Sequence, residues 1–379
     1  MKIKNIIKPV ALLGAAAMLI SASGCADTSW SYKTSNKTLT NGGWIYYTYD
    51  AMNEGISKIQ ADDENFDLTK NDLSSKKIDD KNAVDWINAK AKEHSLDYLT
   101  IFKLAKDFDI SVDEENRKQM KKNYKSYFDA GYMDIYKDLG VGLDTFVDVF
   151  VVYPDLEEKV FQHVYGKDGP KAVKDEDIQK YFTDNYTSYY YIPYSLKKTD
   201  SDGNETDVDD ETKDKVTGKF ADYANELNKG KTTDDIEKSY KKDFETETVP
   251  SVKATDKLED STVPEDVQKV IKELGDKKAT VKTIDNTHYL IYKGSISDEA
   301  KELTKESTDS EDASASTSSV SKDSVLHKMK DDDFKSYLEE ERKKLKVDTN
   351  DACLSKYNVD RTIKIATDSQ KKEQESSAN

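Results

Sequence analysis

Apolar residues recur along the first half of the chain at the spacing of amphipathic helices. The clearest case is residues 80–108, where they alternate at steps of three and four and so share one helical face. Ser111 and Glu114 have the spacing of a capping box, which predicts that another helix begins there. Further apolar repeats follow as far as residue 185. We therefore predict a nearly all-helical segment over residues 42–185.

The pattern changes at Tyr186. Residues 186–196, YTSYYYIPYSL, are aromatic and typical of a strand. Three amphipathic helices follow, and then two short strands joined by Asp285-Asn286, a pair typical of a hairpin turn. With a further strand expected near residues 248–252, this order predicts a small α/β unit over residues 186–297.

The last part of the chain combines polar segments with one more helix. Residues 298–327 are rich in serine and acids and bury too little apolar surface to fold, so we expect a linker. Residues 331–345 have helical spacing, with acids first and basic residues last, as the helix dipole favours. This helix has no apolar neighbour of its own. We expect residues 328–366 to pack on the first helical segment, and residues 367–379 to be a disordered tail.

The first 24 residues have the composition of a secretory signal. Three lysines precede an apolar run over residues 10–20, and small residues then lead to Cys25. The run is shorter than the roughly 20 apolar residues that span a bilayer. Small residues directly before Cys25 resemble a bacterial lipobox, which implies cleavage before Cys25 and lipidation of its sulfur. Two acyl chains suffice for stable anchoring. Ordinary secretion is the alternative. Residues 25–41 are polar and are predicted to be a tether.

The composition narrows the possible partners. The chain has 379 residues and a net charge of −17, and removal of the three signal lysines makes the mature chain three charges more negative. Such a surface repels nucleic acid and anionic lipid headgroups. The 23 tyrosines and 11 phenylalanines supply core material in an otherwise polar chain. If Cys25 is acylated, Cys353 has no partner for an intrachain disulfide.

No cofactor or metal site is predicted. The four histidines, His94, His163, His288 and His327, are scattered without the spacing of metal ligands. His94 lies on the apolar face of the 80–108 helix and is interpreted as a core or boundary residue. The acidic residues 199–213 lack the ligand order of a calcium-binding loop.

Four stretches carry a resemblance to a known family. They are GGWIYYTYDA, AVDWINAKAKEHSLDYLTIFKLAKDFDIS, YGKDGPKAVKDEDIQKYFTDNY and DDDFKSYLEEERKKLKVDTNDACLSKY. The chain resembles the PrsA/SurA-like foldase lipoproteins, which are parvulin-type peptidylprolyl isomerases. This resemblance implies a multidomain α + α/β fold. In it, a split all-helical chaperone domain is interrupted by a small parvulin-like α/β domain.

The resemblance also implies a catalytic pattern from which this chain departs. Active parvulins have a histidine on the first strand, a second on the last strand, and a cysteine or aspartate between them. Here the first strand has Tyr190-Tyr191-Ile192 at the corresponding place, and residues 246–262 lack the Gly-rich segment. His288 lies near the second family position but one residue away, and a shift of one residue turns a strand side chain to the opposite face. His288 is the one catalytic candidate, and an ordinary strand histidine is the alternative.

We therefore expect a lipid-anchored chaperone on the outer face of the cytoplasmic membrane of a bacterium, most simply a Gram-positive one. Its partners would be unfolded or partly folded secreted polypeptides, with no nucleic acid. The parvulin-like domain would be non-catalytic. Five aromatic residues are expected in the core or a cleft: Trp44, Tyr46, Tyr47, Trp86 and Tyr98. The alternatives are an active peptidylprolyl isomerase and a non-enzymatic adaptor lipoprotein with one fixed partner.

Overall fold

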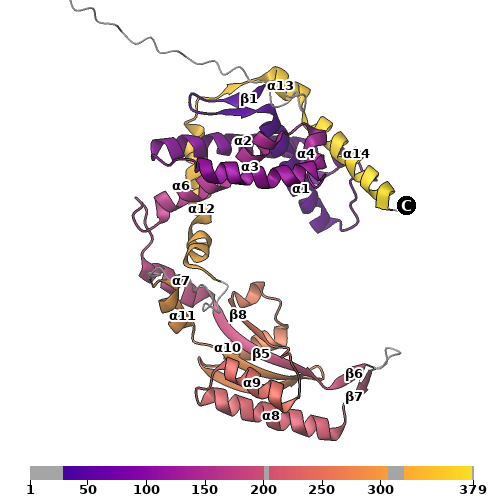
Figure 1. Ribbon diagram of the computed structural model, residues 1–379, viewed down its shortest axis with the longest axis vertical. Coiled ribbons are helices and arrows are strands. Elements are labelled where there is room, and N and C mark those ends of the chain that lie inside the picture. Colours follow the sequence, from indigo (N-terminus) through magenta and orange to yellow (C-terminus); the bar gives the residue numbers. More distant parts are fainter. Residues whose placement is uncertain (1–28, 200–204, 306–319, 378–379) are drawn as a thin grey trace, which may run out of the picture. The chain divides into compact units, whose positions relative to one another are not determined.

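The computed structural model describes residues 29–199, 205–305 and 320–377 (Figure 1). The chain forms two compact units. We call Gln162–Lys335 the middle unit, and the described residues up to Phe161 and from Ser336 onward the terminal unit. The chain is thus a mixture of helices and small sheets in two units, and its first and last described parts belong to the same unit.

The terminal unit is built around two antiparallel helices, α1 (Asn41–Asp62) and α2 (Ala83–Asp107). The Thr40 hydroxyl caps α1 by accepting from the Gly43 amide. The apolar stripe predicted for residues 80–108 is buried on α2 through Ile87, Ala91 and Tyr98. A short 3₁₀ turn, η1 (Leu73–Ser75), and the hairpin β3 (Lys77–Ile78) and β4 (Lys81–Asn82) connect the two helices.

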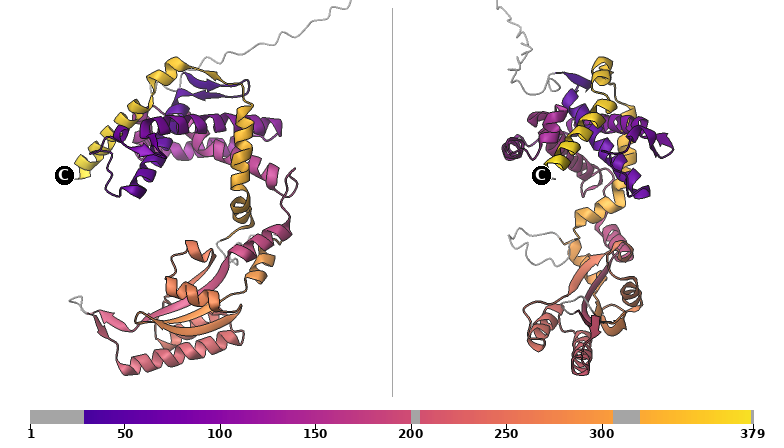
Figure 2. Two further views of the ribbon diagram at one scale, coloured as in Figure 1. Left: turned by 180° about the vertical axis from the view of Figure 1, so that it is seen from behind. Right: turned by 90° about the vertical axis from the view of Figure 1, so that its right-hand side faces the viewer.

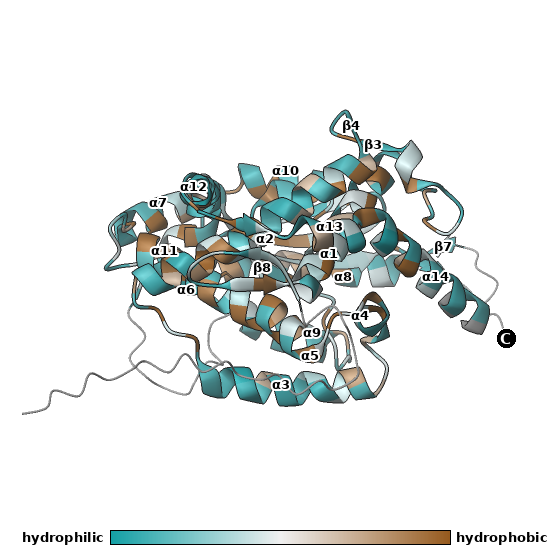
Figure 3. Ribbon diagram, turned by 90° about the horizontal axis from the view of Figure 1, so that it is seen from above, coloured by the Kyte–Doolittle hydropathy of each residue, from teal (hydrophilic) through white to brown (hydrophobic). Residues whose placement is uncertain are grey.

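Shorter helices continue the terminal unit after α2. They are α3 (Glu114–Asp129), α4 (Asp134–Leu139), α5 (Leu143–Val147), a π-helical turn η2 (Asp148–Val152) and α6 (Tyr153–Tyr165). Phe146 on α5 is 1% exposed and lies in the same apolar core as α1 and α2. Figure 3 shows α3 as mostly hydrophilic, and Phe128 is its one fully buried residue.

The terminal unit is not all-helical, because it contains a small antiparallel sheet. Its strands are β1 (Trp30–Lys33), β2 (Thr38–Thr40) and β11 (Asp348–Thr349), in the order β11-β1-β2. The prediction of a polar tether over residues 25–41 is therefore wrong from residue 30 on. Tyr32 and Leu39 are each 2% exposed and join the core, and this burial fixes a segment that is polar on average.

The C-terminal part of the chain also folds into the terminal unit. It consists of the end of α12 (Lys322–Lys343), α13 (Asp351–Lys356) and α14 (Val359–Ser377). The Trp44 indole on α1 donates to the Tyr357 carbonyl at 2.7 Å. Helix α14, yellow in Figures 1 and 2, contacts α1, α2 and α4. The predicted disordered tail over residues 367–379 is therefore wrong as far as Ser377, because α14 continues through it.

The middle unit contains a four-stranded antiparallel sheet. Its strands are β5 (Thr187–Ser195), β8 (Val252–Asp256), β9 (Lys278–Ile284) and β10 (Thr287–Lys293), in the order β8-β5-β10-β9. Asp285 and Asn286 have φ angles of 45° and 62°, as the predicted hairpin turn requires.

Helices cover both faces of this sheet. Helices α8 (Asp210–Asn228) and α9 (Thr233–Asp243) pack on the face that carries Tyr190, Ile192 and Leu290. Helix α10 (Glu265–Glu273) packs on the opposite face with Tyr189 and Tyr191, next to the short turn η3 (Leu258–Asp260). Burial on both faces explains why the sequence of β5 is apolar without alternation.

The borders of the middle unit lie outside the predicted residues 186–297. Helix α7 (Asp175–Asn185) packs on α11 (Ile296–Leu303) inside this unit, so α7 does not belong to the helical domain. The predicted linker over residues 298–327 is wrong at both ends, where α11 and α12 form. Its centre, residues 306–319, lies outside the described residues. Within the acidic residues 199–213, the described part forms strand β7 (Glu205–Asp207), which pairs with β6 (Lys197–Thr199), and the start of the helix that follows.

Candidate functional site

His288, the catalytic candidate from the sequence, lies on β10 and is 8% exposed. Its Nδ1 is 2.8 Å from the Thr283 hydroxyl of β9, and its ring centroid is 5.6 Å from that of Phe220 on α8. Its Nε2 is buried and has no hydrogen-bond partner among the described residues. Burial lowers the pKa of His288, so the ring is neutral at neutral pH. It lies in the core between the sheet and α8.

The strand register does not form a histidine pair around His288. His288 is opposite Tyr194, whereas Tyr190 is opposite Tyr292 and Tyr191 is opposite Ile291. Tyr190 lies on the same sheet face as His288, and Tyr191 lies on the other. The other three histidines are on α2, α6 and α12. This site therefore offers one buried neutral imidazole that is hydrogen-bonded to the Thr283 hydroxyl, and it has no second histidine among the described residues.

The five aromatic residues expected in a core or cleft are mainly core residues. Trp44, Tyr47 and Tyr98 are each less than 5% exposed. Tyr46 is half-buried and stacks on Tyr136 with ring centroids 5.8 Å apart. Trp86 is also half-buried, and its indole donates to an aspartate carboxylate at 3.1 Å. None of the five forms an open aromatic surface.

A different set of aromatic rings does reach the surface of the terminal unit. We call Phe146, Phe150, Tyr124, Tyr127 and Tyr132 the aromatic ladder. Phe150 stacks on Phe146 with centroids 4.9 Å apart, and Tyr124 is 5.7 Å from Phe150. Tyr127 is 6.1 Å from Tyr124 and 6.2 Å from Tyr132. Phe146 is 1% exposed and Tyr124 is half-buried, whereas Phe150, Tyr127 and Tyr132 are 44%, 50% and 78% exposed.

The π-helical turn η2 places Phe150 at this surface. A π-helical turn holds one more residue than an α-helical turn, and such turns are frequent at functional sites. Asp148 begins η2 and accepts from Arg117 of α3 at 2.8 Å. Lys37 of the β1–β2 hairpin lies 3.5 Å from the same carboxylate and 4.0 Å from the Phe102 ring centroid. Desolvation lowers the pKa of Lys37. These contacts tie η2 to α3, and so connect the two elements that carry most of the ladder.

A group of ionisable side chains joins α2, α6 and the end of α12. Tyr153 donates to Glu157 at 2.7 Å, and Arg342 donates to Asp97 at 2.8 Å. Burial raises the pKa of Glu157 and of Asp97, and the nearby Arg342 opposes the rise at Asp97. His94, expected at the core boundary, is half-buried there, with Nδ1 3.3 Å from an aspartate of α1. This group makes the stability of the terminal unit depend on pH.

The remaining sequence predictions concern the two cysteines, metal binding and membrane spans. Cys25 lies outside the described residues. Cys353 is a free thiol whose sulfur is 3.2 Å from the Ser29 hydroxyl, a contact that lowers the pKa of the thiol. Within the described part of the chain, no histidine, cysteine or acid cluster could hold a metal ion. In that same part, every helix is too short or too polar to cross a bilayer.

No protein-family model matches this chain, and no curated protein matches it. The site must therefore be interpreted from its own geometry.

Proposed function

We propose that this protein is a lipid-anchored foldase-like chaperone on the outer face of a bacterial cytoplasmic membrane. It would bind unfolded or partly folded secreted polypeptides, and its middle unit would be a parvulin-like domain without isomerase activity. The observation that carries the proposal is the exposed end of the aromatic ladder.

The ladder supports this function because its three exposed rings belong to one series of ring contacts, in which Tyr124 links Phe150 to Tyr127. Scattered apolar side chains are normal on a protein surface, whereas a contiguous patch marks an interaction site. Tyr127, Tyr132 and Phe150 are three of the four large apolar side chains that are most exposed among the described residues. Aromatic rings contribute large contact areas without requiring a particular partner sequence. The strong negative charge of the rest of the chain would keep such a protein soluble.

The arrangement of the two units supports the resemblance to foldase lipoproteins. In that family a helical domain is split by an α/β domain, and here the chain leaves the terminal unit at Phe161 and returns to it at Ser336. The middle unit supports a non-catalytic role, because His288 is a buried side chain without a second histidine on its sheet. Anchoring through a lipid on Cys25 is part of the proposal, and mass spectrometry of membrane-extracted protein tests it directly.

Aggregation suppression with several unrelated unfolded proteins tests the proposed function. We expect the soluble part of the chain to protect all of them, and the triple variant Tyr127→Ser, Tyr132→Ser, Phe150→Ser to protect them several-fold less. Val252→Ser is the matched control, because Val252 is 37% exposed but lies on β8 of the middle unit. Protection of none of these proteins would support an adaptor instead, and equal loss in the control would refute the role of the ladder.

A protease-coupled peptide assay tests the isomerase alternative. We expect no turnover by the soluble chain at any proline-containing peptide. Turnover that disappears in the variant His288→Ala, while the fold is retained by circular dichroism, would overturn the non-catalytic assignment.

A further inference from the structure

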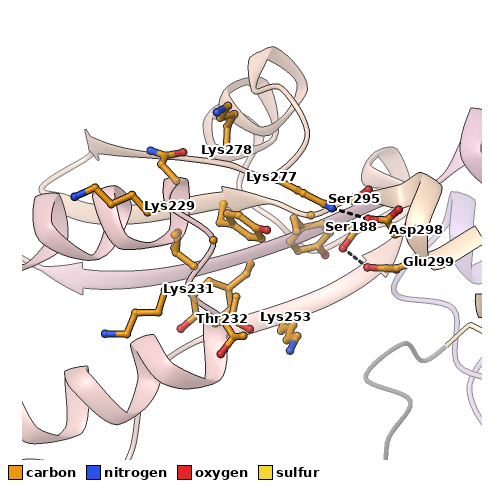
Figure 4. Close-up of a pocket in the computed structure, with 18 residues that line it drawn as sticks. Ser188, Lys229, Lys231, Thr232, Lys253, Lys277, Lys278, Ser295, Asp298 and Glu299 are labelled. Atoms are coloured by element: carbon orange, nitrogen blue, oxygen red, sulfur yellow. Dashed lines mark hydrogen bonds and ion pairs between the residues drawn. The ribbon is translucent and has the colours of Figure 1, made fainter.

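A cluster of lysines surrounds a cavity in the middle unit, and His288 does not line this cavity. A cleft of about 670 Å³ opens between the first residues of β5, the α8–α9 turn, the start of β9 and the start of α11. We call it the basic cleft. Five lysines stand around it, and Figure 4 shows them on several sides of the opening. They are Lys229, Lys231, Lys253, Lys277 and Lys278. A volume of this size is typical of ligand-binding clefts.

The charge of the cleft is opposite to that of the chain. Two acids, Asp298 and Glu299, face the five lysines, although the whole chain carries −17. Asp298 pairs with Lys277 at 2.7 Å. Glu299 is held by the hydroxyls of Ser188 and Thr255, so it accepts hydrogen bonds inside the wall and is not paired with a lysine. Counting also Glu226 and Asp234, which pair with Lys231 and Lys253, four acids accompany the five lysines, so an excess of one positive charge remains at the cleft.

Two of the lysines have no acidic partner. Lys229 and Lys278 are exposed and form no ion pair with any described residue. The other three each have one partner, since Lys231 lies 2.8 Å from Glu226 and Lys253 lies 3.4 Å from Asp234. An exposed pair of this kind is worth about 1 kcal/mol or less, so an anionic ligand can compete for these lysines as well.

The backbone around the cleft is held in place by specific contacts. The Asn228 side chain both donates to the Ala279 carbonyl and accepts from its amide, at 3.0 and 2.9 Å. This joins the end of α8 to the start of β9, so Lys229 and Lys278 sit on connected elements. Gly294 lies so close to Ser188 that an added Cβ would be 2.3 Å from the serine hydroxyl. Polar groups of Thr232, Thr233 and Ser295 also line the cleft.

We propose that the basic cleft binds an acidic segment of an extended polypeptide. The lysines come from three separate segments and surround the opening, an arrangement that fits several carboxylates spread along a chain better than one compact anion. This inference rests on the proposed chaperone function and names a class of client sequence. The cleft would hold such a segment by charge, and the aromatic ladder would bind apolar segments separately.

Fluorescence anisotropy with the full soluble chain tests the proposal. The probe is a labelled Asp/Glu-rich peptide, compared with the same peptide carrying Asn and Gln. We expect the acidic peptide alone to bind, with affinity that falls as salt rises. The double variant Lys229→Glu, Lys278→Glu should weaken binding of the acidic peptide by about tenfold. It replaces two positive charges at the cleft with negative ones, and charge focused in a cleft changes ligand association by about this factor. The control Lys241→Glu, Lys242→Glu makes the same charge change on exposed residues of α9 outside the cleft.

Each outcome decides the proposal. Loss of binding in the cleft variant and not in the control supports it. Equal effects in both variants, equal binding of the neutral peptide, or preferential binding of polyphosphate or inorganic phosphate would overturn it. Aggregation suppression by the same variants separates this failure from failure of the proposed function. If only the cleft inference is wrong, ladder-dependent suppression persists. If the chaperone function is wrong, the unmodified chain shows no suppression.

Discussion

Trp44→Phe is the sharpest test of how the C-terminal segment closes the terminal unit. Trp44 is 2% exposed, and its indole donates to the buried Tyr357 carbonyl, 313 residues away in sequence. Phenylalanine keeps an aromatic ring but removes this donor. A buried acceptor left without its partner costs about 1–3 kcal/mol. The smaller ring leaves a void that adds about 1 kcal/mol. We therefore expect the free energy of unfolding to fall by about 2–4 kcal/mol.

Urea unfolding followed by tryptophan fluorescence measures this change in one unit. All three tryptophans, Trp30, Trp44 and Trp86, lie in the terminal unit, so the signal reports its unfolding and not that of the middle unit. Trp86→Phe is the matched control. Its indole donates to an exposed carboxylate, and water can replace this bond, so we expect a loss below about 1 kcal/mol. If the two variants lose equal stability, the proposed closure by Trp44 and Tyr357 is wrong.

Three further predictions concern the same unit. Asp148→Ala should lower the free energy of unfolding by about 2 kcal/mol, because it leaves the partly buried Lys37 and Arg117 without their shared carboxylate. Asp144→Ala removes an exposed ion pair and should leave this free energy almost unchanged. Urea unfolding compares the two variants. Burial raises the pKa of Glu157 in the folded protein above its value in the unfolded chain. The terminal unit therefore loses stability as the pH rises through the range between these two pKa values, because the unfolded chain releases the proton first. Glu157→Gln should therefore raise the melting temperature at pH 7, with a gain that shrinks in acid; no gain at pH 7 would contradict this. Ala366→Glu should lower the free energy of unfolding by about 3 kcal/mol or more, because Ala366 is 1% exposed and the new carboxylate would be buried. Lys364→Glu lies on the outer face of α14 and should leave the stability nearly unchanged. If circular dichroism shows the same melting temperature for both variants, α14 does not pack on the terminal unit.

The local sequence patterns predicted which helices and strands form better than they predicted the residues at which these elements begin and end. The periodicity over residues 80–108 corresponds to α2, and the predicted strand near residues 248–252 corresponds to β8 at Val252–Asp256. The capping box assigned to Ser111 is wrong, because Asp113 caps α3 by accepting from the amides of Glu115 and Asn116. Several polar residues in a row can each cap a helix, and the backbone geometry selects one of them.

The candidate site was harder to predict than the fold. Tyr124 and Phe128 have the spacing of a buried helical face, and Phe128 is indeed 6% exposed. Tyr127 and Phe150 have large apolar side chains that would also be expected in the core, yet both are exposed. Whether an aromatic side chain is covered depends on which element packs over it, and periodicity within one helix contains no such information. The basic cleft was missed for a similar reason, because its lysines come from three separate segments.

The amino-acid sequence by itself determined what depends on neighbouring residues: the amphipathic helices, the strand β5 and the turn at Asp285-Asn286. Only the tertiary structure decided the secondary structure of the first and last described segments, whose hydrophobic pattern is weak. Strands β1 and β2 form a local hairpin, and β1 also pairs with the distant β11, with Tyr32 opposite Thr349. Helix α14 is ordered because α1, α2 and α4 bury one of its faces. Short strands and polar helices are not stable alone, and their stabilising contacts come from residues about 300 positions away in the chain, which no local pattern reveals.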